Sequence, residues 1–322
     1  MFKLEFELPI IELEEKIGEL RIFAKEKNLD LSNEIAHLEQ RLKELTDSVY
    51  RGLTPWQKVL VARHPARPNA LDYIRLIFTD FLELRGDRLF RDDPAVIGGI
   101  GFFSGRPVTV LGNLKGKDTK ENIERNFGMA CPEGYRKAVR LMLQAEKFRR
   151  PVMTFIDTPG AYCGAGAEER GQAAAIAQSI RTMLALKTPV ISVIIGEGGS
   201  GGALALAAAD RLLMQEHAVF SVISPEAYAS ILWSDPSRAP DAAQKMRLTA
   251  FELSALGVVE EVIPEPRGGA HRDPASAAHY VKEALARHLA ELLAVPVEEL
   301  IRRRLERYRK IGNAYLREQN TN

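Results

Sequence analysis

The first fifty residues carry apolar side chains at helical spacing. These positions recur every three or four residues over 10–20 and again over 31–49, with a break at 28–30. A repeat of this period places the apolar residues on one face of an α-helix. It therefore predicts two antiparallel helices that share an apolar seam and have outer faces rich in Glu and Lys. From the pattern alone, such a hairpin either packs on its own domain or binds a partner, and both interpretations stay open.

A third helix is predicted to begin directly after Thr54. Thr54 is a good cap, Pro55 suits the first turn, and a Gln three residues after the cap can bond back to it. Prolines at positions 65 and 68 then interrupt the helical pattern. We therefore expect an N-terminal unit over residues 1–68, formed by the hairpin and a connecting helix, and a main domain over residues 69–295.

Strands and helices alternate through the main domain. A hairpin is predicted over 96–103 and 107–111, and short apolar runs separated by helices follow it. Strands that are buried on both faces and joined by crossover helices imply a largely parallel, layered α/β fold. The later predicted strands are 152–156, 190–195, 211–215, 219–223 and 258–263, and the predicted helices are 133–149, 172–186, 203–209, 274–293 and 297–309.

Composition and charge exclude several classes of protein. The 322 residues include 44 basic and 43 acidic side chains, a balance that argues against a specialist for nucleic acid or membrane surfaces. Cys131 and Cys163 form no CxxC pair and the six histidines show no HxxxH spacing, so no metal site is expected in this chain. The start lacks the features of a signal peptide, and no apolar run approaches the length of about 20 residues that spans a membrane. We expect a cytoplasmic protein.

Basic residues concentrate only at the C-terminal end. Residues 301–322 carry seven basic and two acidic side chains. Such a cluster is most often a solvated helix face and only occasionally a docking patch. We therefore assign residues 296–322 to a third unit, a C-terminal basic helix.

Two glycine-rich loops, 157–169 and 196–203, follow predicted buried strands. Ligands bind at the carboxyl ends of strands in open α/β sheets. Because glycine has no Cβ, its backbone N–H can approach a ligand closely, and at a helix N-terminus that group also carries positive partial charge. Amides of Gly201 and Gly202, joined by one amide from the first loop, would stabilise an oxyanion. The alternative is that Gly201 and Gly202 only permit tight packing of a helix on the sheet.

Three short motifs also match these loops. Gly196-x-Gly198-x-x-Gly201 fits a dinucleotide fingerprint, but Glu197 would place a carboxylate near the pyrophosphate. Asp157-Thr158-Pro159-Gly160 resembles the DxxG of GTPases, although no GxxxxGK[ST] precedes it. Gly198-x-Ser200-x-Gly202 fits the nucleophile elbow of serine hydrolases, and a hydrolase that uses Ser200 stays open as an alternative. The downstream partners for such a serine would be Asp235 or Asp241, followed by His271 or His279.

Several longer blocks occur in a fixed order along the chain. The most distinctive are IDTPGAY at 156–162, GAEERGQ at 166–172, GEGGSGGALA at 196–205 and SVISPE at 221–226. Shorter blocks include ARHP at 62–65 and NFGM at 126–129. Together they resemble the carboxyltransferase alpha subunits of bacterial multi-subunit acetyl-CoA carboxylase, and the likeness runs to about residue 310. Cys163 departs from the family, which usually has Pro before Gly164.

The resemblance implies a fold, a reaction and partners. The expected fold is α/β and crotonase-like, a superhelix of stacked ββα units with an N-terminal helical hairpin and C-terminal helices. The implied reaction moves a carboxyl group from carboxybiotin, on the biotin carboxyl carrier protein, to acetyl-CoA, and so forms malonyl-CoA in the first committed step of fatty acid biosynthesis. The implied assembly is an α2β2 heterotetramer that works with biotin carboxylase. Its beta subunit has a zinc ribbon and supplies most of the binding site for acetyl-CoA.

The resemblance also implies roles for the loop residues. Gly201 and Gly202 would polarise the ureido carbonyl of carboxybiotin through their amides, with Gly164 as the facing donor. Ser200 would then be an ordinary loop residue. A non-catalytic assembly subunit built on the N-terminal hairpin is the remaining alternative. The residues expected to line the substrate site are Gly198, Gly199, Ala165 and Tyr162.

Overall fold

The computed structural model describes residues 2–313, and a sheet of eight strands forms its centre. Apolar, β-branched runs form most of these strands, as the alternation along the chain predicts. The strands are β1 (Thr79–Glu83), β2 (Val96–Phe103), β3 (Arg106–Asn113), β4 (Val152–Thr158), β5 (Val190–Gly199), β6 (Arg211–Gln215), β7 (Val219–Ser221) and β8 (Glu261–Ile263).

The strand order is β1-β2-β3-β4-β5-β6-β8, and β7 pairs with the end of β5. The first three strands are antiparallel, which confirms the predicted hairpin, and every later pair is parallel. Several sequence-based boundaries shift by a few residues, and one of these shifts changes the picture of the glycine-rich segment. The strand predicted to end at 195 continues to Gly199, because the glycines pair with β4 on one side and with β7 on the other. The second glycine-rich segment is therefore strand and helix, with hardly any loop.

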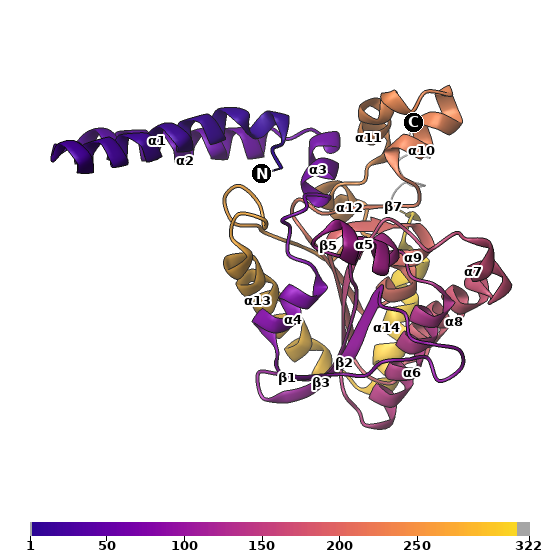
Figure 1. Ribbon diagram of the computed structural model, residues 1–322. Helices are drawn as coiled ribbons and strands as arrows, with labels where there is room; N and C mark the ends of the chain where they lie inside the picture. Colours follow the sequence, from indigo (N-terminus) through magenta and orange to yellow (C-terminus); the bar gives the residue numbers. More distant parts are fainter. Residues whose placement is uncertain (1, 314–322) are drawn as a thin grey trace.

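Helices cover both faces of the sheet (Figure 1). On one face, α4 and α13 pack on apolar residues of the strands. On the other face lie α6, α8 and α9, with α14 against α8. These two layers bury the sheet as the pattern predicts. The helices are α1 (Leu8–Lys27), α2 (Ser32–Arg51), α3 (Pro55–Ala62), α4 (Ala70–Ile77), α5 (Thr119–Glu124), α6 (Pro132–Lys147), α7 (Ala165–Glu169), α8 (Gln172–Ala185), α9 (Ser200–Ala207), α10 (Pro225–Trp233), α11 (Ala239–Met246), α12 (Ala250–Ala255), α13 (Pro274–Leu293) and α14 (Val297–Lys310).

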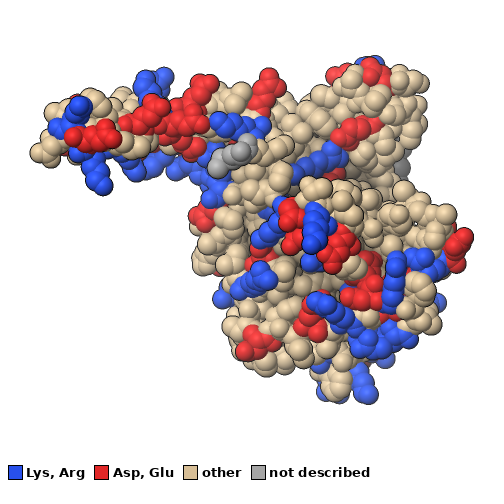
Figure 2. Space-filling view, in the orientation of Figure 1, with Lys and Arg blue, Asp and Glu red and all other residues tan. Residues whose placement is uncertain are grey.

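The helices α1 and α2 form a hairpin, here called the arm, that projects from the body of the molecule (Figure 1). Acidic and basic side chains both occur along it (Figure 2). The arm joins α3 through the capping box that the sequence predicts, in which Thr54 Oγ1 accepts from the Gln57 amide and Gln57 Oε1 accepts from the Thr54 amide. The projecting shape leaves the outer faces of both helices exposed to solvent or to a partner.

The C-terminal helix α14 is anchored by a buried arginine. Arg304 is fully buried, and its guanidinium donates to both carboxylate oxygens of Asp210 at 2.7 Å. It also donates to the backbone carbonyls of Met183, Leu186 and Thr188. The expectation of a solvated basic face is therefore wrong at this position, because α14 turns Arg304 toward the sheet together with Leu300.

The predicted C-terminal unit extends past the described chain, since its residues 314–322 lie outside the part that the structure describes. The division of the chain at residues 68 and 295 stays a prediction. Within residues 2–313, no helix combines the length and the apolarity needed to cross a membrane.

Candidate active site

The carboxyl end of β5 turns directly into α9, and the candidate oxyanion donors lie at this turn. Ser200 adopts the left-handed conformation, with φ of 49°, and this sharp bend begins the helix. Gly201 and Gly202 follow in the first helical turn, where backbone N–H groups have no carbonyl partner within the helix. The positive end of the helix dipole lies at the same place. Two amides of the predicted set thus occupy the position that suits anion stabilisation.

Close packing explains some of these glycines but not all of them. A Cβ on Gly199 would overlap the carbonyl oxygen of Pro159, and one on Gly202 would lie 2.6 Å from the Ala161 nitrogen. Backbone segments of the two glycine-rich regions therefore touch, and both positions need glycine for that contact. A Cβ on Gly201 would meet only the Ile176 side chain, at an ordinary 3.6 Å. Packing gives no reason for glycine at 201.

The structure indicates which part of the first loop faces α9. Gly160 and Ala161 lie against Gly202. Gly164, the predicted facing donor, comes just before α7, and a Cβ there would lie 2.5 Å from the Tyr162 ring. The Tyr162 amide already donates to the Ala130 carbonyl at 3.0 Å. The segment at 160–161 is thus the part of the loop in contact with the paired glycines, while Ala165 opens α7 beyond it.

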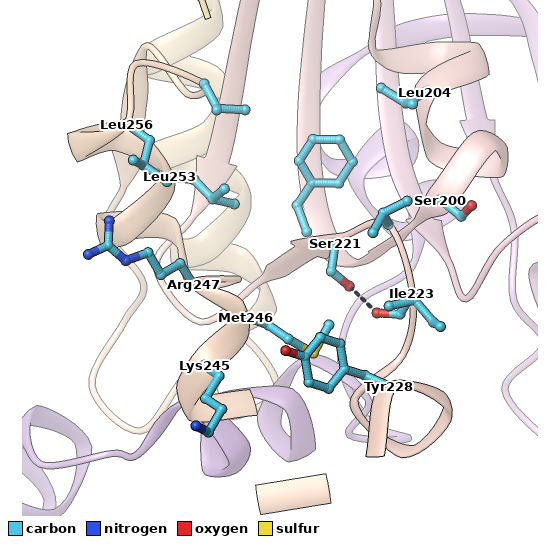
Figure 3. Close-up of a pocket in the computed structure, with 13 residues that line it drawn as sticks. Ser200, Leu204, Ser221, Ile223, Tyr228, Lys245, Met246, Arg247, Leu253 and Leu256 are labelled. Atoms are coloured by element: carbon cyan, nitrogen blue, oxygen red, sulfur yellow. Dashed lines mark hydrogen bonds between the residues drawn. The ribbon is translucent and has the colours of Figure 1, made fainter. Parts of the chain in front are cut away.

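An apolar pocket of about 510 Å³ borders the first turn of α9 (Figure 3). Ser200 and Leu204 form one side, and side chains from α10, α11 and α12 form the others. The charged ends of Lys245 and Arg247 lie at the edge, away from Ser200 (Figure 3). Such a slot can hold a flat, mostly apolar group beside the helix N-terminus. Its remaining lining residues are Phe220, Ser221, Val222, Ile223, Tyr228, Met246, Leu253, Leu256 and Val258.

The pocket gives Ser200 no catalytic partner. Among residues 2–313, those that line it include no His, Asp or Glu. A serine nucleophile needs a base within hydrogen-bonding reach. The four candidate partners are engaged elsewhere: Asp235 with Ser237, Asp241 with Arg238, His271 with Glu7 and His279 with Glu283. The hydrolase interpretation is therefore not favoured.

Charged side chains from three successive strand ends form a network beside the turn. Lys115 Nζ donates to Asp157 Oδ1 at 2.6 Å and lies 3.5 Å from a Glu197 oxygen. Arg63 pairs with Glu197 at 2.7 Å and bridges to Glu226. Burial opposes the charge on Lys115, but the neighbouring Asp157 and Glu197 carboxylates outweigh it and raise the pKa of Lys115. Sequence reasoning missed this network, although Arg63 and Asp157 stand inside the blocks that carry the family resemblance.

A second cluster, Glu7 with His64 and His271, lies at the base of the arm and has enough ligand atoms for a metal ion. Its hydrogen bonds do not suit that role. His64 Nδ1 accepts from the Ala66 amide at 3.1 Å, so the ring proton of neutral His64 lies on Nε2. The two imidazoles are stacked with centroids 4.1 Å apart, so their lone pairs do not converge. Glu7 also accepts from the Tyr50 hydroxyl, and the cluster is better described as the anchor of the arm.

Solved structures with low sequence identity show the fold that this chain shares. The chain matches a Pseudomonas malonate decarboxylase hetero-tetramer in complex with coenzyme A, with a TM-score of 0.61 and 18% identity over 78% of this chain and 98% of that one. It also matches transcarboxylase 12S with methylmalonyl-coenzyme A and methylmalonic acid bound, with a TM-score of 0.55 and 19% identity over 70% and 44% of the two chains. At these identities the likeness shows the fold, and the expected crotonase-like carboxyltransferase fold is confirmed.

Sequence comparison gives the family. The profile described as acetyl co-enzyme A carboxylase carboxyltransferase-like matches residues 3–312. The acetyl-coenzyme A carboxylase carboxyl transferase subunit alpha of Carboxydothermus hydrogenoformans is 61% identical over 312 residues, which is 97% of each chain. The chain belongs to the acetyl-CoA carboxylase carboxyltransferase family, as the resemblance of its sequence blocks predicts.

Proposed function

We propose that this chain is the alpha half of an acetyl-CoA carboxyltransferase, which moves a carboxyl group from carboxybiotin to acetyl-CoA and forms malonyl-CoA. The observation that carries the proposal is the first turn of α9, which is partly exposed at Ser200 and Gly201 and borders an apolar pocket. Packing does not explain why residue 201 is glycine. Membership of the carboxyltransferase family over residues 3–312 supports it.

In the proposed site, the pocket and the N-terminal end of α9 bind different parts of carboxybiotin. The pocket would seat the flat bicyclic ring of carboxybiotin, and the amides of Gly201 and Gly202 would donate to its ureido oxygen. As the N1′–carboxyl bond breaks, its electron pair moves onto the ureido group, and the amides stabilise the negative charge. The released CO2 stays in the site, and the basic biotin nitrogen removes a proton from the acetyl methyl group. The resulting carbanion attacks CO2 to form malonyl-CoA, so no side-chain nucleophile is required.

The facing donor is part of the same proposal. We assign it to the first glycine-rich loop, with the Ala161 amide as the candidate that contact with Gly202 supports and Gly164 as the candidate that the family resemblance implies. Gly198 and Gly199 would support the site from β5, and Tyr162 and Ala165 would border it. The transfer site would lie within residues 69–295, with residues 1–68 and 296–322 serving assembly.

Exposed apolar residues occur on α10 and on the segment that leads into it. Val222 is 78% exposed, and Ile231 and Leu232 of α10 are also exposed. Few charges cover α10 and α11 (Figure 2). Apolar patches of this kind mark protein interfaces. They support binding of a zinc-ribbon beta subunit that supplies most of the acetyl-CoA site. The two subunits would form a cytoplasmic α2β2 assembly that works with the biotin carboxyl carrier protein and biotin carboxylase.

Reconstitution tests the proposed function. The purified chain is assayed for biotin-dependent decarboxylation of malonyl-CoA, alone and with a zinc-ribbon beta subunit. We expect turnover only when both chains are present. Activity of the chain alone on simple esters, together with inactivity of the reconstituted pair on malonyl-CoA, would contradict the proposal.

A substitution at Gly201 tests the role of its amide. Gly201→Val has room beside Ile176, but its side chain would shield the helix end, and loss of one oxyanion donor costs about 10²–10³ in kcat. The control is Gly18→Ala in the arm, where a Cβ has open space and activity should be unchanged. A Gly201→Val complex that assembles and turns over normally would favour the non-catalytic assembly subunit instead.

A further inference from the structure

The pairing of β4 with β5 contains an irregularity just before the candidate active site. From Val152↔Val190 to Ile156↔Ile194 the partners are offset by 38 residues, but at Thr158↔Gly198 the offset is 40. Strand β5 therefore carries two extra residues between Ile194 and Gly198. Bulges of this kind bend a strand and re-aim the residues beyond the bend. Here the next elements are the Ser200 bend and the first turn of α9.

Side chains satisfy the backbone groups that the bulge takes out of the ladder. The Glu197 amide donates to Asp157 Oδ1 at 3.0 Å, and the Ile195 carbonyl accepts from Arg67 Nε at 2.6 Å. Gly196 lies between them, where a Cβ would be 2.6 Å from the same Asp157 oxygen. A buried amide without an acceptor is costly, so these contacts hold the extra residues in one conformation.

Asp157 is itself held by a lysine from the neighbouring strand. Lys115, two residues beyond β3, donates to Asp157 Oδ1 at 2.6 Å and approaches Glu197 at 3.5 Å. Arg63 Nε donates to the other carboxylate oxygen of Glu197, Oε1, at 2.8 Å. Three strand ends are thus joined through the Asp157 carboxylate and its neighbours.

We propose that Asp157, fixed by Lys115, is a positioning residue that closes the β5 bulge and thereby aims the Gly201 and Gly202 amides. Asp157 acts through the Glu197 amide and touches no reacting atom. The inference rests on the proposed function, because it assumes that those amides stabilise the transition state. A shift of about 1 Å in such donors is enough to lower turnover about 10²-fold.

The test compares Asp157→Ala with Asp157→Asn in the reconstituted α/β complex. Asn keeps an oxygen that can accept from the Glu197 amide, whereas Ala removes it. We expect Asp157→Ala to lower kcat by roughly tenfold to a hundredfold, which is the loss that misplaced catalytic groups cause. Both KM values should stay nearly unchanged. Asp157→Asn should recover most of that loss. Amide exchange across 195–199 should be faster in the Ala variant only.

Two lysine variants provide a matched control. Lys115→Met removes the ammonium group that holds Asp157, so it should also lower kcat without changing KM. Lys117→Met removes an exposed lysine two residues later, which pairs with Asp72, and should behave as wild type. If Asp157→Ala prevents assembly, the Asn variant and the Lys115/Lys117 pair still decide the question.

Each result has a defined meaning. An inactive wild-type complex would overturn the proposed function, whereas the exchange measurement on the chain would still report whether Asp157 closes the bulge. An active wild type with an equally active Asp157→Ala variant would overturn the positioning role. Equal loss in the Ala and Asn variants would overturn it too, because the carboxylate charge, and not the acceptor oxygen, would then be required.

Discussion

The β5–α9 turn and the base of the arm are held together by different kinds of contact. At the turn, backbone packs on backbone: Gly199 and Gly202 bring β5 and α9 against residues 159–161. At the base of the arm, the contacts are between side chains: buried Glu7 accepts from Tyr50 and contacts His271 and Arg272. The turn can be disturbed by adding a single methyl group, whereas the arm responds to a change of charge.

The two kinds of contact suit different tasks: the turn must position backbone amides, and the base of the arm must attach the arm to the body. Close contact between main chains leaves little freedom, which suits a site whose amides must point at one atom. Buried ionisable groups are sensitive to protonation and to loss of a partner. We therefore expect changes at the turn to alter turnover and changes at the base of the arm to alter its docking.

Among the changes that distinguish the two regions, Gly199→Ala should have the largest effect. The added Cβ would overlap the Pro159 carbonyl, so the first loop must move away from α9. Overpacking of this kind costs about 1–3 kcal/mol in the free energy of unfolding. Carboxyl transfer should fall about 10²-fold because the donors separate. Gly18→Ala, which adds the same methyl group in open space, is the control, and equal behaviour of the two variants in turnover and thermal denaturation would contradict this account.

Glu7→Gln should loosen the arm and leave the turn intact. The variant removes the charge that Arg272 and His271 face, and hydrogen bonds to charged groups are worth about 2 kcal/mol. Amide exchange in α1 and α2 should become faster while exchange across 196–202 stays the same. Glu14→Gln, at a half-exposed ion pair with Arg272, should change exchange much less. Uniform destabilisation of the whole chain would show that the two regions are coupled.

Acid should weaken the same anchor. Burial, with the neighbouring His271, lowers the pKa of His64 to about 4 from 6.5. Between these values the unfolded chain binds more protons than the folded one, so stability is lost as pH falls from 6.5 toward 4. For Glu7, burial alone would raise the pKa, but hydrogen bonds from His271 and Tyr50 lower it to about 2, which extends the loss from about 4.5 downward. Exchange in the arm from pH 7 to 4.5 measures the trend, which His64→Gln should flatten.

The smallest effect is expected from Ser200→Gly. Glycine accepts the φ of 49° without strain, so stability should be equal or slightly higher, by at most about 1 kcal/mol. Malonyl-CoA formation should persist, because the amides remain. Loss of a serine nucleophile, in contrast, lowers kcat about a millionfold. A loss of that size in the steady-state assay would restore the hydrolase interpretation and remove the distinction between the two regions.

Local patterns are enough to predict most of the architecture. Helical spacing predicts the arm, the cap at Thr54 predicts the start of α3, and apolar runs predict the parallel strands. The position of the glycines at 201 and 202, at a strand end that runs into a helix, is also predictable. The bulge is not, because its closure depends on Asp157 and Arg67, which lie 40 and 128 residues from the groups they bind. Contacts at such separations leave no periodic signal in a single sequence.

The buried arginine of α14 shows that a local signal can be present and still be masked by net charge. Leu300 and Arg304 are four residues apart, so they share one helix face. The apolar member of that pair indicates which face turns inward. Net charge counted over the segment treats all basic residues alike and hides the one that is buried.

Arg304 also has a consequence for the order in which the protein can mature on the ribosome. Arg304 donates to Asp210 and to the backbone carbonyls at 183, 186 and 188. It is synthesised 94 positions after Asp210. Until Arg304 has left the exit tunnel, the buried Asp210 carboxylate lacks the guanidinium that it binds in the folded chain. The ion pair that anchors α14 can therefore form only after residue 304 has been synthesised.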